Sequence, residues 1–252
     1  MKHDLTDTTF IIPLCVESDD RAENALITLS YLFRHLNTNI VVHEYGKEKE
    51  SSIFIRFFPW VQHQYKQNTG IFHRTKYLNE MLSMVKTPIV VNYDIDVLLN
   101  ADTFLSCVQK IRQGADLVYP YFLGNSQYKV NYEGREKVKK TGNLKSLCEN
   151  DVQLDRSEFG HCQFFSTESY RRGGGENEQF ISYAPEDAER AYRFQKLGYN
   201  VSWGTDYIYH LEHSRGVDSS SSNPHFRRNN QLFERIKDMS VQELRQYYER
   251  DK

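Results

Sequence analysis

The chain has 252 residues, which is enough for one large domain or two small ones with a sizeable core. Its 34 acidic and 32 basic residues nearly balance, so the overall charge does not favour a nucleic-acid-binding protein. No apolar run reaches the roughly 18–20 residues of a membrane span, and the N-terminus lacks the layout of a signal peptide, which predicts a cytoplasmic protein.

The first half of the chain alternates predicted strands and helices. Apolar runs predict buried strands at 9–15, 39–45, 52–58, 88–93 and 115–122. Amphipathic spacing predicts helices at 18–36, 74–86 and 101–114. Strands that alternate with helices indicate a mostly parallel sheet covered on both faces.

Residues 124–160 interrupt this alternation because they are polar, charged and without a clear period, which predicts a mobile insertion. Strand-like runs return at 161–166, 200–203 and 207–216, with a helix at 185–198 and a loop at 216–226. Ser240 and Glu243 form a capping-box pattern that predicts a C-terminal surface helix.

The four cysteines contain no C-x-x-C pair. Cys15 and Cys162 lie within apolar runs, so buried thiols in a reducing compartment are expected.

Two aspartates, Asp94 and Asp96, end the apolar run PIVVNYDIDVLLN. In open α/β sheets ligands bind at the carboxyl ends of strands. A D-x-D there can hold a divalent cation that binds phosphate oxygens, although solvated acids that cap a strand end explain the pair equally well.

Three further patterns could carry chemistry. His210 and His213 form an H-x-x-H that could complete a metal site with a carboxylate, although two ordinary histidines fit as well. Glu186 and Asp187 begin a predicted helix, where acids either offset the helix dipole or supply a general base. The glycines at 173–175 are compatible with a backbone approach to a sugar or phosphate, or with a turn.

Five short segments stand in order along the chain: FIIPLCVESDDRAENALITLSYL, FHRTKYLNEML, NYDIDVLL, GGGENEQFISYAPEDAE and HLEHSRG followed by NPHF. Together they resemble the GT-A-fold nucleotide-sugar glycosyltransferases of the bacterial family-2 type and, in the C-terminal half, the β-1,4-galactosyltransferases. The resemblance covers roughly residues 9–233 except 124–160.

The resemblance implies one GT-A domain over 1–252, an α/β fold whose mixed, mostly parallel sheet has helices on both faces. Its parts would be a nucleotide-sugar-binding half at 9–122, the insertion at 124–160, an acceptor-binding and catalytic half at 161–233 and a C-terminal helix at 238–252.

For the metal and nucleotide, the resemblance implies that Asp96, His210 and His213 ligate Mn²⁺ or Mg²⁺. It places Asp94 beside the ribose or on the metal through water. Arg74 would complement the pyrophosphate, and the family's motif puts Phe72 against the nucleotide as well.

For the acceptor, the resemblance makes Asp187 the catalytic base and Glu186 the residue that positions the acceptor. Tyr183 is expected among the donor-binding residues, where its ring would stack on a pyranose at the sugar site. One departure concerns the nucleotide. After Pro13, itself expected at the nucleotide site, the galactosyltransferases carry arginines where this chain has LCVES at 14–18, so Glu17 or Arg21 is expected to serve uracil or ribose instead.

The resulting hypothesis is a metal-dependent inverting transfer from a UDP-sugar, of galactose or N-acetylgalactosamine type, to a saccharide or lipid-linked saccharide acceptor. Surface polysaccharide synthesis with peripheral contact at the inner face of a membrane is the implied setting, and no nucleic-acid partner is expected. A non-catalytic carbohydrate-binding protein, a sugar-phosphate nucleotidyltransferase and a D-x-D phosphohydrolase are the alternatives. The nucleotidyltransferase would need a Gly-rich loop that PLCVESDDR lacks, and the phosphohydrolase would need its D-x-D on the first strand.

Overall fold

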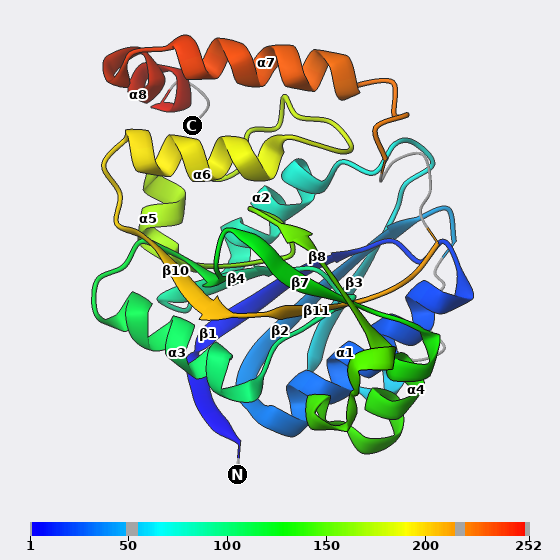
Figure 1. Cartoon of the computed structure of the whole chain (residues 1–252). Helices are drawn as coiled ribbons and strands as arrows, with labels where there is room; N and C mark the ends of the chain where they lie inside the picture. Colours follow the sequence, from blue (N-terminus) through cyan, green and yellow to red (C-terminus); the bar gives the residue numbers. More distant parts are fainter. Residues whose placement is uncertain (1, 49–54, 215–219, 250–252) are drawn as a thin grey trace.

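The computed structural model describes residues 2–48, 55–214 and 220–249 of the chain. Its centre is a seven-stranded sheet with the order β10-β6-β9-β4-β1-β2-β3 (Figure 1). The strand β9 is antiparallel to both neighbours, β4 and β6, while the other pairings are parallel. The strands are β1 (His3–Leu14), β2 (Leu36–Gly46), β3 (Val61–Gln67), β4 (Ile89–Tyr93), β6 (Leu117–Tyr121), β9 (Cys162–Ser166) and β10 (Val201–Asp206).

Helices cover both faces of this sheet. In Figure 1, α1, α3 and α4 lie on one side and α2, α5 and α6 on the other, with α7 and α8 beyond α6. Their bounds are α1 (Asp19–His35), α2 (Arg74–Met84), α3 (Ala101–Arg112), α4 (Tyr132–Thr141), α5 (Thr167–Arg172), α6 (Glu186–Lys196), α7 (Phe226–Asp238) and α8 (Val241–Glu249). The predicted α/β class, a mostly parallel mixed sheet with helices on both faces, is confirmed. None of the helices in the described ranges is long and apolar enough to cross a membrane.

A second sheet of four strands has the order β5-β11-β7-β8. Its strands are β5 (Val97–Leu98), β7 (Gly124–Val130), β8 (Val152–Ser157) and β11 (Ile208–Leu211). The segment 124–160 therefore supplies two strands, the helix α4 and two short 3-10 turns at Leu144–Ser146 and Glu149–Asp151. Its expected mobility stays a prediction, but regular secondary structure fills most of it.

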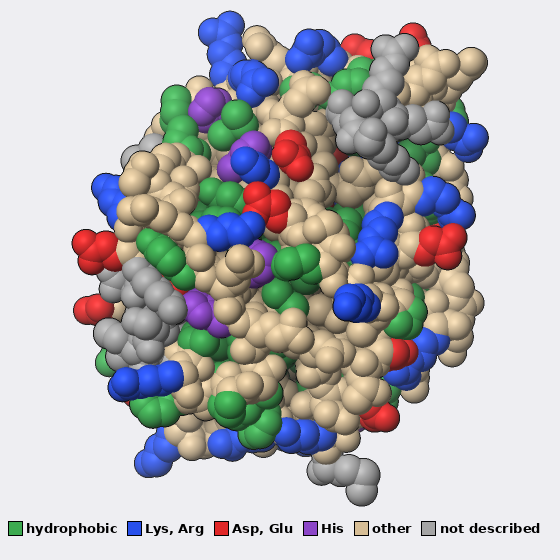
Figure 2. All heavy atoms as spheres, turned by 180° about the vertical axis from the view of Figure 1, so that it is seen from behind, with side chains coloured by type: hydrophobic (Ala, Val, Ile, Leu, Met, Phe, Trp, Pro, Cys, Tyr) green, Lys and Arg blue, Asp and Glu red, His purple; other side chains and the backbone are tan. Residues whose placement is uncertain are grey.

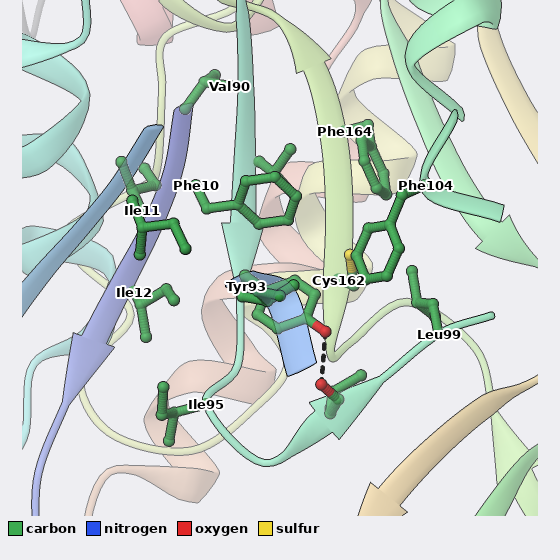
Figure 3. Close-up of a cluster of buried hydrophobic side chains, with 14 of the residues drawn as sticks. Phe10, Ile11, Ile12, Val90, Tyr93, Ile95, Leu99, Phe104, Cys162 and Phe164 are labelled. Atoms are coloured by element: carbon green, nitrogen blue, oxygen red, sulfur yellow. Dashed lines mark hydrogen bonds between the residues drawn. The ribbon is translucent and has the colours of Figure 1, made fainter. Parts of the chain in front are cut away.

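The core packs against the strand that ends in the two aspartates. Figure 3 shows Tyr93 among the rings of Phe10 and Phe104, and its hydroxyl donates to the backbone carbonyl of Val97. Tyr93 is fully buried. This hydrogen bond links β4 to β5, the two strands that flank the turn with Asp94 and Asp96.

Three elements differ from the sequence expectations. Residues 52–54 of the predicted strand 52–58 lie outside the described ranges, but Ile55–Phe57 is a 3-10 turn, so the strand prediction is wrong there. The strand that follows instead is β3, which pairs with the side of β2 away from β1 and was not predicted. Because β3 lies at the sheet edge, its sequence VQHQYKQ has too few apolar residues to indicate a strand. The helix α7 was not predicted, although it buries Leu232 and Ile236 in a second core cluster.

The cysteines occur as free thiols, and the charges on the surface are mixed rather than segregated. None of the four cysteines forms a disulfide, and Cys107 and Cys162 are buried. Cys15 is half-buried rather than buried, because it follows β1 where the chain lines a cleft. On the face shown in Figure 2, acidic and basic side chains are interspersed, in keeping with the near balance of charge in the sequence.

Candidate active site

One cleft of about 1110 Å³ collects every residue that the sequence proposed for the site. It lies where β1 and β4 end, with β7, β8 and the start of α6 also contributing to its walls. The predicted residues that line it are Pro13, Glu17, Arg21, Phe72, Arg74, Asp94, Asp96, Tyr183, Glu186, Asp187, His210 and His213. Residues up to 200 positions apart thus share one cavity, while their individual roles stay predictions.

The group that could hold a metal is Asp96 with His210 and His213. A carboxylate oxygen and one ring nitrogen from each histidine all lie within 4.8 Å of one another. The Nε2 atom of His213 is 2.9 Å from Oδ2 of Asp96, and the Nε2 atom of His210 is 3.8 Å from Oδ1. One carboxylate with two imidazoles is a donor set that suits Mn²⁺ and similar ions.

Local electrostatics keep Asp96 ionised. Burial acts to raise the pKa of Asp96, but the facing His210 and His213 outweigh it, and the net pKa is lowered well below the usual range. The pKa of His213 is raised: burial opposes the rise, and the hydrogen bond to Asp96 drives it. A deprotonated carboxylate is the form that a metal ion requires.

Main-chain hydrogen bonds hold the segments of Asp96 and His210 side by side. The strand β11 pairs antiparallel with β5, so that His210 stands opposite Val97. The backbone N–H of Leu211 also donates to the carbonyl of Asp96 at 2.8 Å. The segments around 96 and 210 are thereby fixed by backbone hydrogen bonds rather than by side chains alone.

Arg74, the first residue of α2, joins the D-x-D turn to the start of α6. Its Nη2 donates to Oδ1 of Asp94 at 2.7 Å, and its Nη1 lies 3.5 Å from Oδ1 of Asp187. Burial opposes the charged form of Arg74, but Asp94 and Asp187 raise its pKa overall. The guanidinium therefore bridges two carboxylates, and its expected contact with a pyrophosphate stays a prediction.

The neighbouring carboxylates Glu186 and Asp187 have different environments. Glu186 is buried, and burial followed by the charge of Asp187 raises its pKa to about 8. The Oε2 atom of Glu186 has no hydrogen-bond partner among the described residues. The side chain of Asp187 is 26% exposed and faces the cleft. The raised pKa favours the protonated form of Glu186, and Asp187 is the more accessible carboxylate.

Comparisons with known proteins bear on the fold. No family model matches the sequence, and no curated protein matches it either. The structure resembles solved structures that include the mannosyltransferase PcManGT from Pyrobaculum calidifontis in complex with GDP-Man and Mn²⁺, with a TM-score of 0.58 and 18% sequence identity. The match covers 83% of this chain and 58% of that chain, so this chain spans little more than half of its neighbour.

The chain has a GT-A fold. At 18% identity the likeness shows the fold alone. The narrower resemblance to bacterial family-2 enzymes and to galactosyltransferases stays a prediction. In the GT-A fold described above, the Asp96 turn and the start of α6 lie on the same cleft.

Sequence reasoning missed a buried ion pair behind Asp187. Arg190 donates through Nε to Oε1 of Glu176 at 2.6 Å and through Nη2 to Oε2 at 2.9 Å, and the same Nη2 lies 2.9 Å from Oδ1 of Asp187. Both Arg190 and Glu176 are buried. The Nδ2 amide of Asn92 and the hydroxyl of Tyr170 also donate to Glu176. The signal in the sequence was the i,i+3 spacing of Asp187 and Arg190 on one helix face.

The glycines at 173–175 support packing rather than a ligand. A Cβ on Gly173 would meet Phe194, one on Gly174 would meet Tyr248, and one on Gly175 would meet Asn79. None of the three lines the cleft. Of the two interpretations that the sequence left open, the turn is therefore supported.

Another glycine does face the site. A Cβ on Gly160 would lie 3.2 Å from Oδ2 of Asp187, which is tighter than ordinary contact. The segment 124–160 also contributes basic side chains to the cleft that the sequence did not single out, namely Lys129, Arg135 and Arg156.

Proposed function

We propose that the protein is a metal-dependent glycosyltransferase that moves a sugar from a nucleotide sugar to a hydroxyl group of a saccharide acceptor. The observation that carries this proposal is that one cleft holds both the Asp96, His210 and His213 set and the accessible carboxylate of Asp187. A cation held by the three-residue set would stabilise a departing diphosphate. The carboxylate of Asp187 could remove the proton of an acceptor hydroxyl. A structural neighbour with GDP-Man and Mn²⁺ supports the same chemistry.

The donor set fits a divalent cation. Asp96 would supply a carboxylate oxygen, and His210 and His213 would each supply an imidazole nitrogen. Mn²⁺ fits this mixed set better than Mg²⁺, which prefers oxygen ligands. When bound, the cation supplies positive charge that offsets the charge of the departing diphosphate.

Asp187 would act as the general base. It takes the proton of the acceptor hydroxyl while that oxygen bonds to the anomeric carbon and the bond from that carbon to the diphosphate breaks. A single displacement of this kind inverts the anomeric configuration. Arg74 and Arg190 both donate to Oδ1, which leaves Oδ2 on the side of Gly160. The raised pKa of Glu186 favours its uncharged form, which limits the negative charge beside the base.

The donor is proposed to be a UDP-sugar of galactose or N-acetylgalactosamine type, with GDP-mannose as the competing candidate from the structural neighbour. Glu17 and Arg21 line the nucleotide end of the cleft in this proposal, and Tyr183 offers a ring that would stack on the donor sugar. The acceptor is proposed to be a saccharide or lipid-linked saccharide of surface polysaccharide synthesis.

The test is a panel of UDP-galactose, UDP-N-acetylgalactosamine and GDP-mannose, each with and without Mn²⁺. Bound ligand raises the melting temperature with its occupancy, so we expect one donor to stabilise the wild-type protein only when Mn²⁺ is present. Asp96→Asn should abolish this response. Asp155→Asn is the matched control, because Asp155 lines the same cleft but pairs with Lys129 rather than with the histidines.

Metal-independent stabilisation by a free sugar would favour the carbohydrate-binding alternative instead. Hydrolysis of the donor by the wild-type protein with Mn²⁺, lost in Asp187→Asn, would separate an enzyme from a binding protein. An equal Mn²⁺ response in the Asp96→Asn variant and its Asp155→Asn control would refute the metal site.

A further inference from the structure

His161 stands at the start of β9 with a backbone that does not suit most side chains. Its φ is 72°, in the left-handed region that favours glycine. The main chain there is fixed on both sides. The N–H of Asp94 donates to the carbonyl of His161 at 2.9 Å, and the hydroxyl of Tyr121 donates to the carbonyl of Gly160 at 2.6 Å.

This backbone places the imidazole beside the metal-ligand candidates. His161 lines the cleft, and its ring centroid lies 5.5 Å from that of His210, which is 5.4 Å from that of His213. The preceding residue, Gly160, faces Oδ2 of Asp187. The pair Gly160–His161 therefore passes between the proposed metal site and the proposed base, where the bond between sugar and diphosphate would break.

We propose that His161 binds the diphosphate of the nucleotide-sugar donor through an imidazole N–H, in addition to the contacts of the Asp96, His210 and His213 set. This inference rests on the proposed function. An imidazole N–H is a suitable donor to a phosphate oxygen, and a hydrogen bond to a charged acceptor is among the stronger ones. The position next to His210, one of the three metal-ligand candidates, favours the diphosphate as the group that His161 contacts.

The left-handed backbone at His161 has company at this cleft, because Ser182 and Ala184 also line it with a positive φ. Unfavourable backbone conformations of non-glycine residues cluster at binding and catalytic sites, where the surrounding structure enforces them. At His161 the hydrogen bonds to the carbonyls of Gly160 and His161 enforce the conformation. What distinguishes His161 from Ser182 is its ring, which lies beside that of His210.

The experiment compares His161→Gly and His161→Asn with the wild type. Both replacements suit a left-handed backbone, so neither is expected to lower the melting temperature by more than a few degrees. Ser182→Gly is the matched control, because Ser182 also lines the cleft with a φ of 65°. Calorimetric titration with UDP and with GDP, at saturating Mn²⁺, gives the affinity of each protein for the diphosphate group.

We expect both His161 variants to bind the preferred nucleotide about tenfold more weakly or worse, the size of a lost hydrogen bond to a charged group. The control variant should stay within about twofold of the wild type. Binding of Mn²⁺ alone should be unchanged in all variants, because His161 is not one of the three ligand candidates.

Three results would overturn the inference. Wild-type affinity in the two His161 variants would show that the imidazole does not contact the diphosphate. An equal loss in the Ser182→Gly control would assign the effect to backbone flexibility. Loss of Mn²⁺ binding would make His161 a metal ligand instead. Failure of the wild-type protein to bind either nucleotide would refute the proposed function itself, and the inference with it.

Discussion

The ion pair between Arg190 and Glu176 gives the sharpest prediction, because it separates stability from catalysis. Arg190→Met removes the guanidinium that contacts both oxygens of Glu176 and Oδ1 of Asp187. Breaking a buried pair leaves one charge without its partner and costs about 3–5 kcal/mol. For a chain of this size each kcal/mol corresponds to about 2–4 °C, so the melting temperature should fall by about 6–20 °C.

The double variant Arg190→Met with Glu176→Gln should recover most of that loss. Gln has nearly the shape of Glu, and its one amide oxygen can accept from Asn92 and Tyr170, which both donate to Oε1 of Glu176. It carries no charge that needs a buried cation. Stability is then restored while the donor to Asp187 is still missing.

Catalysis should remain impaired in the double variant. Loss of one hydrogen bond to a charged group corresponds to about 1.5–3 kcal/mol, or roughly 10–150-fold in kcat. Arg190→Lys keeps the charge and should restore part of the activity but not the two-pronged contact with Glu176.

The assays are thermal unfolding and the measurement of kcat with a nucleotide sugar and Mn²⁺. A double variant with wild-type kcat would refute a positioning role for Arg190. A single variant that loses less than about 1 kcal/mol would refute the reasoning about the buried charge.

Three further predictions concern the start of α6 and the glycine opposite it. Asp187→Asn should bind the donor normally but lower kcat by about 10²–10⁴-fold, and unchanged turnover would remove Asp187 as the base. Because the pKa of Glu186 is raised to about 8 in the folded protein from an ordinary 4.5, its contribution to stability is present below pH 4.5 and is lost as the pH rises through 8. Melting temperatures measured from pH 4.5 to 8 should therefore fall more steeply in the wild type than in Glu186→Gln, and parallel curves would contradict the raised pKa. Gly160→Ala should lower kcat about tenfold or more with little effect on the melting temperature, because its Cβ would press on Oδ2 of Asp187; equal kinetics would show that the base tolerates the contact.

The sequence was informative where a local pattern has one physical meaning. Helical spacing predicted α1, α2 and α3 within a few residues, because each of them buries a mainly apolar face. The bounds of α6 were also predicted within a few residues, although its buried side carries Glu189, Arg190 and Arg193. Sequence patterns did not predict the strand β3 or the strands within 124–160. The edge strand β3 buries few side chains, and the strands β7 and β8 are specified by pairing with each other and with β11. Pairing partners that are distant in sequence leave no period to read.

The site shows the same division between local and tertiary information. The sequence by itself determined which chemical groups were available: the D-x-D at 94–96, the H-x-x-H at 210–213 and the acid pair at 186–187. Only the tertiary structure decided which of their atoms meet. Pairing of β11 with β5 brings His210 to Asp96, and packing of α6 buries Glu186 while it leaves Asp187 facing the cleft. The sequence did not single out Arg190 or Glu176, because burial of a charged pair depends on partners that only the fold supplies.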